Sequence, residues 1–266
     1  MTSASSLPTP AEAVRQHLPR GVPRLLQETA TGRLSVREVF PPRRALARGK
    51  GAVTIGAVAL LSFGLLFSLV KRNGSQATDL RATRSLQRVK NPAFDRLMRA
   101  VSWPGFPPQS RIIPPALAAG WLVMGFPMEA AFQFAAWGAA GISHIVKRVM
   151  KRPRPVQGQV MVRPARIGGS SFPSGHVLIY TGVYGFLALL LETLIRSSRI
   201  RRVAVGALTG LVALVGPSRI YLGHHWLTDV LASYLLGTTY VLALMATYRR
   251  AKTRWLNRER ARRQAS

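Results

Sequence analysis

Long apolar runs, each flanked by basic residues, constrain the fold of this chain more than any other feature. The first run covers residues 52–70, with Lys50 before it and Lys71 after it. At about 1.5 Å per residue, a helix of this length nearly spans a hydrocarbon core about 30 Å thick. The run is therefore predicted to cross a membrane as an uncleaved signal anchor. Residues 1–50 are rich in Pro, Ser and Arg, so we expect no cleavable signal peptide there but a partly disordered tail.

Five further apolar runs follow, at residues 112–126, 130–146, 175–195, 203–215 and 227–248. Together with the first run they predict an all-α fold, a six-transmembrane-helix bundle that occupies residues 51–248. Six crossings leave both termini on the same side of the membrane. Residues 249–266 are strongly basic and are predicted to form a second tail.

The charge of the chain supports a membrane protein rather than a nucleic-acid binder. Lys and Arg number 38 against 9 Asp and Glu, yet 48% of the residues are hydrophobic. The charges fall between the apolar runs, whereas a nucleic-acid-binding domain would spread them over a soluble fold. The absence of cysteine excludes disulfides, thiolate chemistry and zinc sites that use Cys.

The distribution of basic residues predicts cytoplasmic termini. The side that holds both tails carries 21 Lys and Arg, against 17 on the opposite side. By the positive-inside rule the more basic side is cytoplasmic, and the basic turn at 196–202 and the C-terminal cluster support the same orientation.

The first loop, residues 71–111, is predicted to contain an interfacial helix. Phe94, Leu97, Met98 and Val101 recur at helical spacing, and the helix is expected to end near Trp103. The basic loop would attract the headgroups of anionic lipids. A plain surface helix is the alternative.

Polar residues of catalytic type occur between the last two apolar runs. If the chain is helical from Trp226 onward, His225 and Asp229 lie one turn apart on the same face. The carboxylate could hold the imidazole in one tautomer and leave the other ring nitrogen as a nucleophile. In the alternative interpretation, Asp229 only caps the helix and the histidines lie among lipid headgroups.

The six-span topology brings two more polar stretches to the same face, and the combination suits phosphoryl transfer. Lys147, Arg154 and Arg219 could surround the oxygens of a transferring phosphoryl group. Ser174 and the backbone N–H groups of Gly175 and His176 would open the fourth span, where the helix dipole favours an anion. His176 would serve as acid and base.

No metal or other cofactor is expected, because cations and dipoles take the place of Mg²⁺ and Asp229 is the only acid on these stretches. Each part also has a simpler interpretation. Lys147, Arg148, Lys151 and Arg152 could be ordinary cationic flanks of a span, and residues 173–175 could be only a turn that caps a helix.

The motifs Lys147-x6-Arg154-Pro155, Pro173-Ser174-Gly175-His176 and Ser218-Arg219-x5-His225-x3-Asp229 resemble, in order and spacing, the signature of the type 2 phosphatidic acid phosphatase and vanadium haloperoxidase superfamily. The resemblance covers about residues 52–248. It implies a six-helix membrane phosphatase whose site faces the outer or luminal leaflet. It further implies His225 as nucleophile, Asp229 as its partner, His176 as acid and base, and Lys147, Arg154, Ser174, Gly175 and Arg219 as phosphate ligands.

Three functions are compatible with this signature. The first is a lipid phosphatase that acts on phosphatidate, phosphatidylglycerophosphate or a polyprenyl diphosphate such as undecaprenyl diphosphate. The second is a vanadium-dependent haloperoxidase, which the membrane spans disfavour because the haloperoxidases it resembles are soluble. The third is a noncatalytic membrane protein that binds lipid phosphate, for which a nucleophile would be unnecessary.

Overall fold

The computed structural model describes residues 42–165, 167–195 and 198–265. Within these ranges the regular elements are helices, accompanied by an isolated bridge between Gln157 and Val160. The all-α prediction is confirmed. The helices are α3 (Pro42–Lys71), α4 (Gln76–Leu86), α5 (Pro92–Ser102), η2 (Trp103–Gly105), α6 (Gln109–Val123), α7 (Pro127–Ala136), α8 (Ala139–Met150), α9 (Gly175–Leu194), α10 (Ser198–Tyr221) and α11 (Leu227–Ala265).

Helix α9 forms the centre of the bundle, because it is apolar on all sides and therefore best buried on all sides. Helices α7, α8, α10 and α11 all pack against it. Phe186 and Leu190 belong to a core shared with α6, α7 and α11, whereas Val177 and Val183 belong to a core shared with α5 and α10. The N-terminus of α9 is thereby fixed between the ends of its neighbours.

Four helices in the described part of the chain are long and apolar enough to cross a membrane: α3, α9, α10 and α11. Helix α3 lies at the edge of the bundle against α11, and its Leu61 and Leu65 are 70% and 74% exposed. Apolar side chains so exposed are typical of a surface that faces lipid. The remaining predicted spans correspond to α6, which has 15 residues, and to the α7–α8 pair.

The expectation of a single helix over residues 130–146 is wrong, because the chain breaks between α7 and α8 at Trp137 and Gly138. The hydroxyl of Tyr240 on α11 donates a hydrogen bond to the backbone oxygen of Ala135, at 2.5 Å. Gly138 allows this approach, since a Cβ there would lie 2.7 Å from the Tyr240 oxygen. Packing against α11 therefore interrupts the helix.

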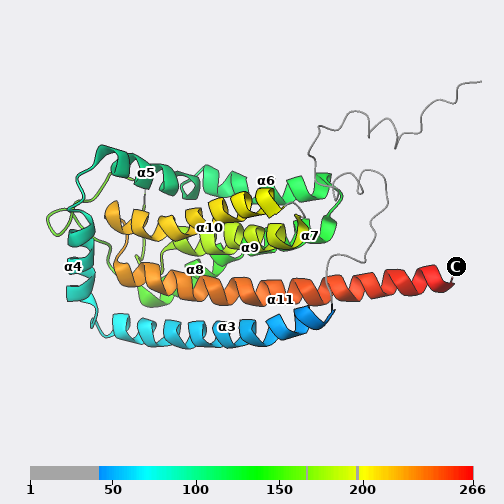
Figure 1. Cartoon of the computed structure of the whole chain (residues 1–266). Coiled ribbons are helices and arrows are strands. Elements are labelled where there is room, and N and C mark those ends of the chain that lie inside the picture. Colours follow the sequence, from blue (N-terminus) through cyan, green and yellow to red (C-terminus); the bar gives the residue numbers. More distant parts are fainter. Residues whose placement is uncertain (1–41, 166, 196–197, 266) are drawn as a thin grey trace, which may run out of the picture.

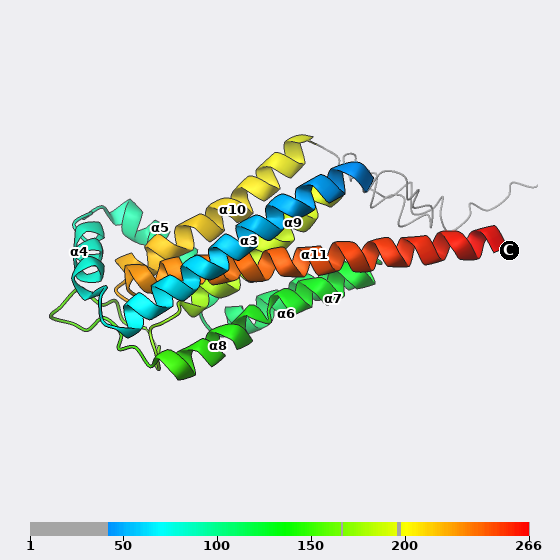
Figure 2. The ribbon, with the colours of Figure 1, turned by 90° about the horizontal axis from the view of Figure 1, so that it is seen from below.

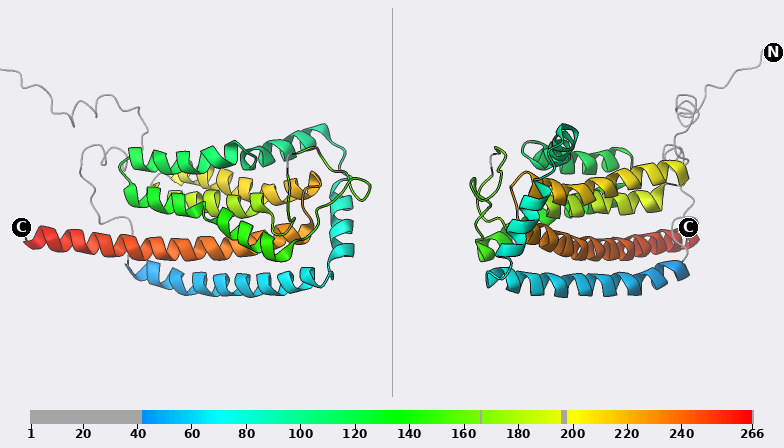
Figure 3. Two further views of the ribbon diagram at one scale, coloured as in Figure 1. Left: turned by 180° about the vertical axis from the view of Figure 1, so that it is seen from behind. Right: turned by 60° about the vertical axis from the view of Figure 1, so that its left-hand side comes forward.

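Helices α4 and α5 belong to the first loop, and α4 lies across one end of the bundle of long helices (Figures 1 and 3). The predicted amphipathic helix is present as α5 and ends at Ser102. Its Met98 and Val101 are buried by protein, in cores shared with the C-terminal end of α10. Leu97 and Trp103 remain exposed on the outside, so only part of the apolar face is available to a membrane interface.

The two predicted tails differ in what the structure describes. Residues 1–41 of the N-terminal tail lie outside the described residues, and residues 42–50 already belong to α3. The C-terminal segment is helical, because α11 continues to Ala265 and extends beyond the other helices (Figures 1 and 2). The beginning of α3 and the end of α11 lie at the end of the bundle opposite α4 (Figure 1).

Candidate active site

The predicted site residues come together at the end of the bundle that α4 crosses. The C-terminal ends of α8 and α10 and the N-terminal ends of α9 and α11 meet there, joined by residues 151–174 and by a short link before Leu227. Each element contributes to one connected cluster, whose members are Lys147, Arg154, Ser174, Gly175, His176, Arg219, His225 and Asp229. Three motifs that are far apart in sequence therefore form one site.

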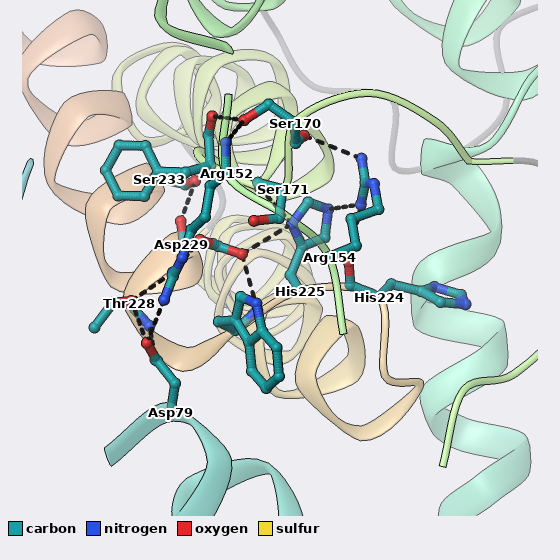
Figure 4. Close-up of polar contacts among 12 residues, drawn as sticks. Asp79, Arg152, Arg154, Ser170, Ser171, His224, His225, Thr228, Asp229 and Ser233 are labelled. Carbon is teal, nitrogen blue, oxygen red and sulfur yellow. Dashed lines mark hydrogen bonds and ion pairs between the residues drawn. The ribbon is translucent and has the colours of Figure 1, made fainter. Parts of the chain in front are cut away.

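Two contacts define the tautomer of His225 (Figure 4). Its Nδ1 lies 2.7 Å from the backbone oxygen of Ser171, which can only accept, so Nδ1 carries the proton. Its Nε2 lies 3.2 Å from Nη1 of Arg154, which can only donate, so Nε2 is the acceptor. The imidazole therefore presents an unprotonated Nε2 toward the cluster of cations.

The surroundings of His225 also keep its ring neutral. The side chain is buried, and burial lowers the pKa of His225 well below its usual value near 6.5. The positive charges of Arg219, Arg154 and Lys147 lower this pKa further. A neutral imidazole with a free Nε2 is the form that can act as a nucleophile.

Asp229 makes shorter contacts elsewhere than with His225. Its Oδ2 lies 3.5 Å from Nδ1 of His225 and accepts a 2.9 Å hydrogen bond from the backbone N–H of Trp226. Its Oδ1 accepts a 2.6 Å hydrogen bond from Nη1 of Arg152. The predicted pairing of His225 with Asp229 is therefore a long contact, and the guanidinium of Arg152 is the closest partner of the carboxylate.

Arg152 links this carboxylate to a second one (Figure 4). Its Nη2 lies 2.6 Å from Oδ2 of Asp79 on α4 and 3.1 Å from Oγ of Ser75. Asp79 is 1% exposed and also accepts hydrogen bonds from the backbone N–H and the hydroxyl of Thr228, both at 2.9 Å. The interpretation of Arg152 as an ordinary cationic flank is thus wrong.

Lys147 and Arg154 hold the loop that precedes α9. The Lys147 ammonium donates a 2.6 Å hydrogen bond to the backbone oxygen of Ser170. The Arg154 guanidinium donates to the backbone oxygens of Gly168, at 3.0 Å, and His224, at 2.8 Å. Arg154 also contacts Nε2 of His225 and so connects the loop to the link between α10 and α11, whereas Lys147 connects the loop to α8.

Several buried donors at the site have no hydrogen-bond partner among the described residues. They include Ser174 Oγ, His176 Nε2, and Nε and Nη2 of Arg219. Arg219 is fully buried, and its Nη1 is held by a 2.6 Å hydrogen bond to Oγ of Ser102. Because buried polar groups are nearly always hydrogen-bonded, these atoms form a set of donors suited to an anion.

Phe106 and Gly105 pack against two of the site residues, His176 and Arg219. The ring of Phe106 meets His176 edge to face at 4.6 Å between centroids, and the Arg219 guanidinium lies 4.9 Å from the Phe106 centroid. A Cβ on Gly105 would overlap the His176 ring. The η2 turn is thus closely fitted against both His176 and Arg219.

His224 has a different environment from its neighbour. Its Nε2 lies 2.8 Å from the backbone oxygen of Arg163, which accepts the hydrogen bond. Burial, followed by the charge of Arg219, lowers the pKa of His224 to about 4. His224 therefore anchors the 151–174 loop, whereas Nδ1 of His225 faces Asp229.

In the described part of the chain, no three His, Cys, Asp or Glu side chains are grouped closely enough to hold a metal ion. Sequence reasoning missed Asp79, Ser102, Phe106 and the bridging role of Arg152. One signal for Asp79 was available. Asp79 and Asp95 are the only acids in a loop with nine basic residues, and an acid buried among so many cations suggests an ion pair.

Comparison with known proteins agrees with this architecture. A family model described as the PAP2 superfamily matches residues 129–253. Phosphatidylglycerophosphatase B of Bacillus subtilis (strain 168) is 25% identical over 181 residues, which cover 66% of this chain and 86% of that protein. The crystal structure of a transmembrane PAP2 type phosphatidylglycerolphosphate phosphatase from Bacillus subtilis has a similar fold, with a TM-score of 0.65 at 21% identity over 73% of this chain and 96% of that one. The segment at residues 129–253, which holds the candidate site, thus matches the PAP2 superfamily, as the three sequence motifs predicted.

Proposed function

We propose that this protein is an integral membrane lipid phosphatase that works through a phosphohistidine intermediate on His225. The observation that carries the proposal is the orientation of His225. Its unprotonated Nε2 shares the site with donors of Ser174, His176 and Arg219 that have no partner in the part of the chain that the structure describes. A nucleophile facing a set of anion-binding donors suits phosphoryl transfer.

In the first step, Nε2 of His225 attacks phosphorus and the bond between phosphorus and the lipid oxygen breaks. Lys147, Arg154, Arg219, Ser174 and the N-terminus of α9 at Gly175 bind the phosphoryl oxygens and stabilise their charge. His176, made cationic by the bound phosphate dianion, donates its Nε2 proton to the leaving oxygen. The ring of His225 gains a positive charge, which the carboxylate of Asp229 stabilises.

In the second step, water cleaves the phosphohistidine. Neutral His176 takes a proton from the water as its oxygen attacks phosphorus, and the bond from phosphorus to Nε2 of His225 breaks. Inorganic phosphate leaves, and both histidines return to their starting states. None of these steps uses a metal, because the cations of the site supply the charge stabilisation.

For the membrane arrangement, we propose six crossings, made by α3, α6, the α7–α8 pair, α9, α10 and α11. The termini would be cytoplasmic and the site extracytoplasmic. In support, the beginning of α3 and the end of α11 lie at the end of the bundle opposite α4 and the site (Figure 1). The many Arg residues of the α11 extension favour a cytoplasmic location.

The substrate we propose first is phosphatidylglycerophosphate, because the curated relative is named as a phosphatase of that lipid. Phosphatidate and polyprenyl diphosphates such as undecaprenyl diphosphate remain the competing substrates. The basic first loop would concentrate any of these anionic lipids near the site.

The test is release of phosphate from a panel of these lipids by detergent-solubilised protein in EDTA, with the His225→Ala variant alongside. We expect turnover by the wild type, none by the variant, and a 32P-labelled acid-labile protein adduct with labelled substrate. Turnover that survived in His225→Ala would exclude the proposed mechanism. Vanadate binding without turnover of any lipid would instead favour a noncatalytic phosphate-binding protein, and halide oxidation by vanadate-loaded protein would favour a haloperoxidase.

A further inference from the structure

Arg152 is the link between α4 and the nucleophile. One guanidinium contacts two buried carboxylates, with Nη1 2.6 Å from Oδ1 of Asp229 and Nη2 2.6 Å from Oδ2 of Asp79. The Arg152 side chain is 10% exposed, and the two acids are 0% and 1% exposed. At this depth an ion pair is held firmly, because an unpaired buried charge is very unfavourable.

The arrangement determines which oxygen of Asp229 can reach His225. Arg152 takes Oδ1, so Oδ2 is left for Nδ1 of His225 at 3.5 Å and for the backbone N–H of Trp226. Figure 4 shows the order of the three groups, with Arg152 between Asp79 and Asp229 and with His225 beyond Asp229. A carboxylate rotated away from this position would lose its contact with the imidazole.

Asp79 in turn fixes Arg152 to the start of α11. The Asp79 carboxylate accepts hydrogen bonds from the backbone N–H and the hydroxyl of Thr228, the residue before Asp229. The Thr228 hydroxyl also accepts a 2.8 Å hydrogen bond from Arg152. Helix α4 therefore contacts the same turn of α11 that carries Asp229.

We propose that Arg152, anchored by Asp79 on α4, is a positioning residue that orients Asp229 and balances its charge, and thereby keeps His225 neutral and its Nε2 nucleophilic. This inference rests on the proposed function, because it assigns a role in the reaction of His225. It gives the first loop a part in catalysis, since α4 belongs to that loop.

The charges around His225 predict the sign of the effect. The groups that act on it are the cations Arg154, Lys147 and Arg219, the acid Asp229, and His176. Removing Arg152 takes away one positive charge and leaves the negative charges of Asp229 and Asp79 uncompensated. Both changes favour the protonated imidazole, so the pKa of His225 rises and the nucleophile becomes available only at higher pH.

The experiment measures kcat and KM against pH for Arg152→Met, Arg152→Lys, Asp79→Asn and the double variant Asp79→Asn/Arg152→Met. For Arg152→Met we expect a fall in kcat of about 10–100-fold, little change in KM, and an acid limb displaced to higher pH, as when a group that orients a catalytic side chain is removed. Arg152→Lys keeps the positive charge, so the acid limb of its kcat–pH profile should return to the wild-type position. The double variant should be no worse than Arg152→Met, since both substitutions break one chain of contacts.

The matched control is Arg148→Met, in the last turn of α8 and four residues before Arg152, where the arginine is exposed. It should retain wild-type kinetics. A purely structural role for Arg152 would lower the amount of folded protein without moving the acid limb, and that outcome overturns the proposal. If Arg152→Met does not fold, Asp79→Asn decides, because wild-type kcat in that variant also overturns it.

The design separates this inference from the proposed function. Loss of turnover in His225→Ala, measured on the same substrate, tests the proposed function alone. A wild-type enzyme that depends on His225 but shows the same pH profile with and without Arg152 would retain the proposed function and exclude the positioning role.

Discussion

The Nδ1 atom of His225 lies 2.7 Å from the backbone oxygen of Ser171, and this contact determines which ring nitrogen can react. Sequence spacing alone suggested that Asp229 holds the imidazole, yet its carboxylate oxygen is 3.5 Å away. A backbone carbonyl accepts the hydrogen bond from Nδ1–H. The proposed role of the carboxylate is to stabilise the positive charge that the ring gains during the reaction. The loop before α9 therefore positions the proposed nucleophile as directly as the link between α10 and α11 that contains it.

The pH dependence of activity follows from the environment of His225. Burial, followed by the charges of Arg219, Arg154 and Lys147, lowers its pKa well below 6.5, so the nucleophile stays neutral through mildly acidic pH. We expect kcat/KM, corrected for titration of the substrate phosphate, to remain level from neutrality to below pH 6.5. An acid limb at or above pH 6.5 that was assigned to His225 would contradict this prediction.

The same depressed pKa predicts the pH dependence of stability. Between its low folded pKa and 6.5, the unfolded chain binds a proton at residue 225 that the folded protein excludes, so stability is lost as the pH falls below 6.5. Thermal unfolding in detergent should show a midpoint that decreases from pH 7 to pH 5. The decrease should be smaller in a His225→Gln variant, which cannot titrate.

Substitution of Arg219 by lysine should impair phosphate binding. The buried guanidinium donates from Nη1 to Ser102, and its Nε and Nη2 have no hydrogen-bond partner among the described residues. Lysine retains the charge but lacks the planar guanidinium, whose N–H donors can bind two phosphate oxygens at once. We therefore expect kcat/KM to fall about 100-fold. Arg148→Lys, at an exposed position of α8, is the control and should behave as the wild type. Equal activity of Arg219→Lys and wild type would argue against a phosphate contact.

Addition of one methyl group at Gly105 should displace His176. A Cβ there would overlap the imidazole ring, which is already packed against Phe106. We expect Gly105→Ala to lower kcat by about 10–100-fold through misplacement of the proposed acid, with the fold retained. Gly120→Ala is the matched control, because a Cβ at Gly120 meets nothing within 4 Å. An unchanged kcat in Gly105→Ala would show that His176 can shift without consequence.

A buried ion pair at the end of the bundle opposite the site should matter for stability. Glu129 on α7 is 1% exposed, and its Oε1 accepts 2.8 Å hydrogen bonds from Tyr248 and Lys252 on α11. Lys252→Met leaves the carboxylate without its cation, which should reduce the free energy of unfolding by about 3 kcal/mol. Thermal unfolding should show the loss, whereas Arg254→Met, at an exposed position of the same helix, should leave the midpoint unchanged.

The positions of the long helices and the all-α fold could be predicted, because the length of each apolar run and the periodicity of its residues indicate a helix directly. The runs that became α3, α9, α10 and α11 were recognisable from length and hydropathy. The break in the third run was not, because its cause is a hydrogen bond from Tyr240 to Ala135, about a hundred residues apart in sequence. Likewise, the spacing of Phe94, Met98 and Val101 predicted a helix but not that α10 would cover its apolar face.

The sequence by itself determined the all-α membrane fold, the three polar motifs and the family they indicate, because each depends on the type and spacing of residues close together in the chain. Only the tertiary structure decided three contacts. The backbone oxygen of Ser171 orients the His225 ring, the hydroxyl of Ser102 accepts a hydrogen bond from one nitrogen of the Arg219 guanidinium, and the carboxylate of Asp79 anchors Arg152. Each of these is a contact between distant segments, made directional by hydrogen-bond geometry and strengthened by burial. No local pattern of residues encodes which donor meets which acceptor across such distances.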